Sequence, residues 1–165
     1  MKKLAIAAML FAASTGSAFA ASGNTSATSG ASTATVVTPI VLTHTPIAKL
    51  GFGKFTHGTG GTIAVTALGI GSVTGDVGFV PGSVNSADAF TLAGDISRSY
   101  SIATTGGTVT LGATNMAFTT TPSAIAGTMT IAGISAFTVG GTLTVAGTEG
   151  PGAYTGTYSA TVTYN

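Results

Sequence analysis

The last fourteen residues, GAYTGTYSATVTYN from Gly152 to Asn165, decide the fold class. Their large apolar side chains all fall on even positions, whereas the odd positions carry mostly hydroxyl side chains. Since successive side chains of a strand point to opposite faces, this spacing predicts a strand with one core face and one solvent face. A shift of one residue would expose the whole apolar face, so the register is firmly set. The predicted core-facing positions are Gly152, Tyr154, Gly156, Tyr158, Ala160, Val162 and Tyr164.

The same strand chemistry extends back to Ala34. Thr, Val, Ile and aromatic residues alternate with small polar ones, and Gly or Pro interrupts them about every ten residues. No stretch has a sustained helical period. We therefore expect an all-β chain in which residues 34–165 form one antiparallel, immunoglobulin-like β-sandwich.

Three double glycines are interpreted as tight turns between short strands: Gly60-Gly61, Gly106-Gly107 and Gly140-Gly141. On this interpretation residues 98–104 and 107–112 are separate strands, as are 135–139 and 141–146, although neighbouring segments of this kind also have the composition to merge.

The N-terminus has the organisation of a secretory signal peptide over residues 1–20. Lys2 and Lys3 precede an apolar run over 4–13, and Ala18-Phe19-Ala20 forms a small-residue cleavage site. The alternative, a membrane anchor, needs about 20 apolar residues, so we expect no membrane span in the mature chain. Residues 21–33, rich in Ser, Thr and Ala, are typical of a flexible leader. We expect export to the periplasm and then to the cell surface or the extracellular space.

The charge pattern excludes several classes of partner. Only 5% of the residues are charged, and after residue 20 three basic residues face four acidic ones. Nucleic-acid binding requires clustered Lys and Arg, and none are clustered here. A surface this neutral also lacks the charges that discourage edge-to-edge pairing of strands, so it suits either a Thr-coated secreted domain or a subunit that packs against copies of itself.

We find no pattern typical of catalysis, cofactor binding or metal binding. His44 and His57 are the only histidines and there is no Cys, whereas zinc requires three or four ligands. No Gly-x-Ser-x-Gly elbow is present, and Lys54 is followed by Phe55, unlike a phosphate loop. The acidic residues have turn-like neighbours and are interpreted as solvated loop carboxylates: Asp76, Asp88, Asp95 and Glu149.

The terminal segment resembles the last strand of chaperone-usher pilins, with alternating apolar residues, a penultimate aromatic and a Gly fourteen residues from the end. That resemblance implies that a periplasmic chaperone reads the strand, which then borders a groove filled by the next subunit. The positions that would carry these contacts are Gly152, Tyr154, Tyr158, Ala160, Val162 and Tyr164. A carbohydrate-stacking platform of tyrosines is the alternative, but strict alternation on one strand favours a core face.

A second resemblance covers nearly the whole mature chain. The segments ATVVTPIVLTHT (34–45), LGFGKF (50–55), SADAFTLAGD (86–95), SYSI (99–102) and residues 140–165 are similar to the bacterial domain-of-unknown-function family 4402. Membership implies a secreted, pilin-like β-domain and names no activity.

The N-terminal segment is a candidate for donation to another copy. Its apolar residues on one face are Ala34, Val36, Ile40 and Leu42. A donated strand supplies main-chain hydrogen bonds and fills pockets with alternate side chains. The alternative is that this segment is the domain's own first strand. We therefore expect a fimbrial or surface-fibre subunit that self-assembles by strand exchange, with a self-contained glycan- or protein-binding module as the alternative and a secreted hydrolase as a weaker one.

Overall fold

The computed structural model describes residues 27–165. The predicted signal peptide, 1–20, and the first part of the leader lie outside these residues. The chain divides into two units, Met1–Thr35 and Val36–Asn165, and only the second contains strands in its described part. Residues 27–35 are exposed and carry no helix or strand. Among residues 27–165 no helix is long and apolar enough to cross a membrane.

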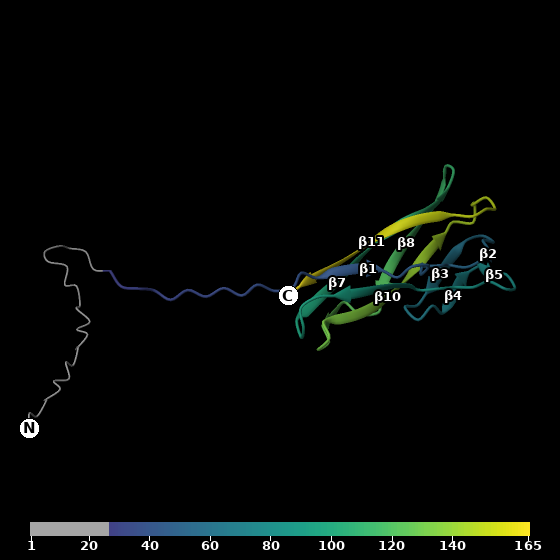
Figure 1. Ribbon diagram of the computed structural model, residues 1–165. Helices are drawn as coiled ribbons and strands as arrows, with labels where there is room; N and C mark the ends of the chain where they lie inside the picture. The colour runs from purple at the N-terminus through teal and green to yellow at the C-terminus, as the bar shows by residue number, and fades with distance from the viewer. Residues whose placement is uncertain (1–26) are drawn as a thin grey trace, which may run out of the picture. The chain divides into compact units, whose positions relative to one another are not determined.

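Residues 36–165 form an all-β, antiparallel structure, which confirms the predicted class (Figure 1). Nine strands belong to one sheet, whose main path runs β1-β6-β10-β8-β7-β11; β3 pairs with β10, β4 with β3 and β9 with β7, while β2 and β5 pair separately. The strands are β1 (Val41–His44), β2 (Phe55–Thr56), β3 (Gly61–Val65), β4 (Gly71–Gly75), β5 (Gly78–Phe79), β6 (Asp88–Ala93), β7 (Ser99–Leu111), β8 (Thr114–Pro122), β9 (Ala126–Thr128), β10 (Ile134–Val145) and β11 (Thr155–Tyr164).

Two of the three double glycines are not turns, so that interpretation was wrong for them. Gly106-Gly107 lies inside β7, opposite a register shift in β11, and Gly140-Gly141 lies inside β10. A Cβ atom on Gly140 would lie 2.2 Å from the carbonyl oxygen of Val65. These glycines therefore allow close backbone crossings in long strands. Gly60-Gly61 does lie at a turn, where the Gly60 N–H donates to the His57 carbonyl.

β10 organises the sheet because it changes partner at its glycine pair. Residues 134–139 pair with β6, residues 141–145 pair with β3, and β8 lies along the other edge. The predicted strands 135–139 and 141–146 are thus one bent strand, as are 98–104 and 107–112 in β7.

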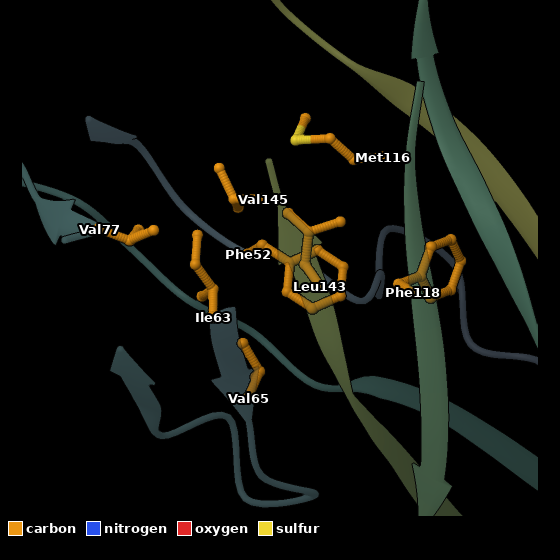
Figure 2. Close-up of a cluster of buried hydrophobic side chains, with 8 residues drawn as sticks. All are labelled: Phe52, Ile63, Val65, Val77, Met116, Phe118, Leu143 and Val145. Atoms are coloured by element: carbon orange, nitrogen blue, oxygen red, sulfur yellow. The ribbon is translucent and has the colours of Figure 1, made fainter. Parts of the chain in front are cut away.

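The core has two clusters of buried side chains. The first is drawn in Figure 2 and consists of Phe52, Ile63, Val65, Val77, Met116, Phe118, Leu143 and Val145. The second consists of Leu92, Tyr100, Ile102, Met129, Phe137 and Val139. Tyr158 packs against both clusters, so the middle of β11 covers the junction between them.

Candidate functional site

The two strands at the ends of the main sheet path, β1 and β11, face each other without backbone pairing. Within the described chain, β1 pairs only with β6, and β11 pairs only with β7. Both nevertheless pack on the second cluster: Ile40 and Leu42 from the β1 side, Val162 and Tyr164 from β11. We call this boundary the seam: β11 lies on one side of it, and β1 with the chain that follows β1 lies on the other.

The predicted two-faced character of β11 is visible along the seam. Tyr154, just before the strand, and Tyr158, Ala160, Val162 and Tyr164 within it are half-buried, while the odd positions of the strand are exposed. Because they pack on the two core clusters, a flat sugar-stacking platform does not describe the tyrosines. Gly152 is exposed before the strand begins, and a Cβ atom there would lie 2.3 Å from Cδ2 of Leu111.

Near the C-terminus a tyrosine hydroxyl bridges the seam. Tyr164 Oη donates to the carbonyl of Thr38 at 3.1 Å and accepts from the Asp95 N–H at 2.5 Å. The Arg98 guanidinium lies 5.4 Å from the centre of the Tyr164 ring, within cation–π range. This end of the seam is therefore closed by the Tyr164 side chain, without backbone pairing between β1 and β11.

A second bridge lies further along the seam and is centred on a carboxylate. His44 Nε2, at the end of β1, lies 2.6 Å from Asp88 Oδ1, and Tyr158 Oη, on β11, donates to Asp88 Oδ2 at 2.8 Å. The Ala89 N–H also donates to Oδ1. Burial, and then the hydrogen bond to Asp88 and its charge, raise the pKa of Tyr158, so the hydroxyl keeps its proton. We call this bridge the Asp88 clasp.

Two of the four acidic residues are buried, so their interpretation as solvated loop carboxylates was wrong. Asp88 is 5% exposed and begins β6, directly between the end of β1 and the middle of β11. Glu149 is 7% exposed and accepts hydrogen bonds from the N–H groups of Ala146, Gly147 and Thr148. Burial acts to raise the pKa of Glu149, but these backbone donors outweigh it and the pKa lies below its ordinary value.

Beyond the Asp88 clasp the seam opens into a groove of about 1640 Å³. One wall is the chain over 48–58 and the other is the segment 152–160. The floor belongs to the first cluster and includes Met116, Phe118 and Leu143. An apolar groove beside the outer edge of a strand has the form that accepts an added strand.

The candidate donor residues lie at different places. Ala34 belongs to the exposed segment 27–35 and Val36 is 97% exposed. Ile40 and Leu42 are half-buried against the second cluster, and Leu42 lies in β1, opposite Leu92 of β6. The segment that the sequence nominates for donation is thus partly the first strand of its own domain in this state.

Among residues 27–165 no group of three or more His, Asp or Glu side chains is placed to hold a metal ion. Sequence reasoning missed the Asp88 clasp because its three side chains are 44 and 70 residues apart along the chain. A signal for it does exist, since Asp88 directly precedes the apolar alternation AFTLA of a strand.

A family model described as Domain of unknown function (DUF4402) matches residues 42–164. The matched range runs from β1 to the last residue of β11 and so includes both sides of the seam. No curated protein and no solved structure matches the chain.

Proposed function

The chain belongs to the family described as Domain of unknown function (DUF4402), and on that premise we propose that it is an exported structural subunit that builds a fimbrial or other surface fibre by β-strand exchange between copies. The family description names no activity, so support for this function comes from the seam. We propose no catalytic role for the chain.

The observation that carries the proposal is the mismatch between the two strands that face each other. β1 has 4 residues and β11 has 10, so β1 is too short to accompany all of β11, and the groove is lined by His44, where β1 ends, and by the chain after it. Thr38 lies beside Tyr164, and His44 is joined through Asp88 to Tyr158, so residues 38–44 run along the C-terminal part of β11. The same residues of a neighbour, seated closer to β11, would give this part of its outer edge the backbone partners it lacks in the described chain.

In a fibre each copy both donates and accepts. Its own β1 leaves, and the interval between β6 and β11 becomes free for residues 34–44 of a neighbour, which include β1. Ile40 and Leu42 of the neighbour would then contact the second cluster of the accepting copy, just as they contact the second cluster of their own domain in this structure. We further propose that the completed subunit is an immunoglobulin-like sandwich, and that a periplasmic chaperone covers the seam before assembly at the cell surface.

The test is a denaturing gel of the mature chain, run with and without heating. Strand-exchanged polymers resist the detergent until heated, because many backbone hydrogen bonds must break together. We expect a ladder of bands that heating collapses to one. A single monomer band from concentrated, unheated protein, also after prolonged incubation, would contradict the proposal.

One observation favours a second function, a self-contained binding module for a glycan or a protein. β1 is paired with β6 of its own domain, and two bridges already close part of the seam. On this alternative the groove is the binding site of a finished monomer. The same gel separates the two, since a module gives only the monomer band.

A further inference from the structure

The Asp88 clasp ties three strands together at the point where the closed part of the seam meets the groove. His44 is the last residue of β1, Asp88 is the first residue of β6, and Tyr158 lies in the middle of β11. We propose that this clasp is a latch that keeps β1 in its own domain and sets the rate at which the strand is released for exchange. The proposal rests on the proposed function, because it concerns the regulation of the same seam.

The carboxylate is suited to a latch because it is buried and fully engaged. Asp88 is 5% exposed, and both of its oxygens have partners: Oδ1 with His44 and the Ala89 N–H, Oδ2 with Tyr158. A buried charge that loses a hydrogen-bond partner is strongly destabilised. Withdrawing β1 removes His44 from Oδ1. Departure of the strand therefore leaves the buried Asp88 carboxylate without one of its partners, which costs free energy.

Aromatic packing holds the clasp in register. The Phe90 ring lies edge-on to His44 at 5.1 Å and to Tyr158 at 6.3 Å, and it stacks on Phe137 at 5.1 Å. Phe118 contacts the Tyr158 ring from the side of the first cluster. Rings packed on both sides hold the Tyr158 hydroxyl beside Asp88, so the carboxylate cannot turn toward solvent or follow His44 when β1 departs.

The latch acts on the rate and leaves the equilibrium nearly unchanged. In an exchanged assembly the neighbour's segment brings an identical His44 to the same Asp88, as expected when identical elements swap between copies. The His44–Asp88 contact is therefore present before and after exchange, and absent only while β1 is in transit. A contact of that kind raises the barrier for both directions.

The experiment compares Tyr158→Phe with two controls. Tyr158→Phe removes the hydroxyl but keeps the ring in the core. Thr62→Val removes a hydroxyl whose partner is the Thr74 hydroxyl, between β3 and β4 and away from the seam. Ile63→Val lowers global stability from the first cluster, away from the seam. The chain has no Cys, so Ala113→Cys, at an exposed position, provides a single attachment site for a fluorophore. Energy transfer between fluorophores on different copies then reports subunit mixing.

Two quantities are measured: the rate of subunit mixing, and the hydrogen–deuterium exchange of the peptide that contains 41–44 in the monomer. We expect Tyr158→Phe to raise both roughly tenfold, from the loss of one partner of a buried charge. The final monomer-to-oligomer ratio should stay the same. Thr62→Val should match the parent chain, and Ile63→Val should raise exchange across all strands without singling out β1.

The outcomes separate the latch from the proposed function. If oligomers form but Tyr158→Phe mixes at the parent rate, or only as fast as Ile63→Val at equal stability, the latch is overturned and strand exchange stands. If no variant forms oligomers, strand exchange is overturned, and the latch is judged by the monomer alone. Selective loss of protection in β1 then supports it, and unchanged protection overturns it.

Discussion

β10 and β11 are strands of similar length, 12 and 10 residues, with opposite positions in the sheet. β10 pairs with β3, β6 and β8, and six of its residues are buried: Phe137, Val139, Gly140, Gly141, Leu143 and Val145. β11 pairs with β7 alone in the described chain, and its core-facing side chains are only half-buried. Alternation of side chains defines the two faces of a strand, whereas the neighbouring strands decide whether both of its edges are paired or one remains open to a further strand.

The largest expected effect comes from shortening a buried side chain of β10. Leu143→Ala in β10 removes a side chain that is 1% exposed, and we expect it to lower the free energy of unfolding by about 2–5 kcal/mol. Val162→Ala, in the half-buried face of β11, should cost about half as much or less, because part of that side chain already contacts solvent. Urea denaturation of both variants measures the difference. Equal losses would show that β11 is as enclosed as β10.

A smaller effect tests the close approach between Gly140 in β10 and the Val65 carbonyl at the end of β3. Gly140→Ala places a Cβ atom against the Val65 carbonyl, and we expect a loss of roughly 1–3 kcal/mol from the forced backbone shift. Gly78→Ala is the matched control, since its Cβ would meet only the Thr56 hydroxyl at 3.5 Å, an ordinary contact. If thermal unfolding shifts equally for the two, close packing at β10 does not explain its glycines.

The smallest effect concerns the Glu149 loop that lines the groove beside β11. The pKa of Glu149 is lowered in the folded chain, so its contribution to stability is present above the ordinary value of 4.5 and is lost as the pH falls below it. Glu149→Gln should therefore be less stable than the parent chain by about 1 kcal/mol near neutral pH. The gap should shrink toward about pH 3. A gap that stays constant across this range would exclude the carboxylate charge as its cause.

The faces of β11 could be predicted from sequence because a strand imposes a two-residue period on any chain that uses it. From Tyr154 to Tyr164 the burial follows that period at every position except Gly156, which was predicted to face the core and is exposed. The all-β class followed for the same reason.

The double glycines and the buried carboxylates could not be predicted in the same way. Glycine favours a tight turn and a close strand crossing alike, and only the partners of β10 distinguish them at Gly140-Gly141. Asp88 resembles a loop residue until β1 and β11 lie on either side of it, which depends on residues 44 and 70 positions away. Burial of a polar group is a property of the assembled sheet, and a local pattern does not report it.

The most direct test of the central claim is a crosslinking measurement on mixed oligomers. A photoreactive group is attached at Val36→Cys, in a position that is 97% exposed and outside both core clusters, and labelled protein is mixed with ¹⁵N-enriched copies that lack the probe. We predict crosslinks from residue 36 of one copy to β11 of a copy with the other isotope. Crosslinks confined to a single copy, or oligomers whose crosslinks avoid β11, would contradict the account.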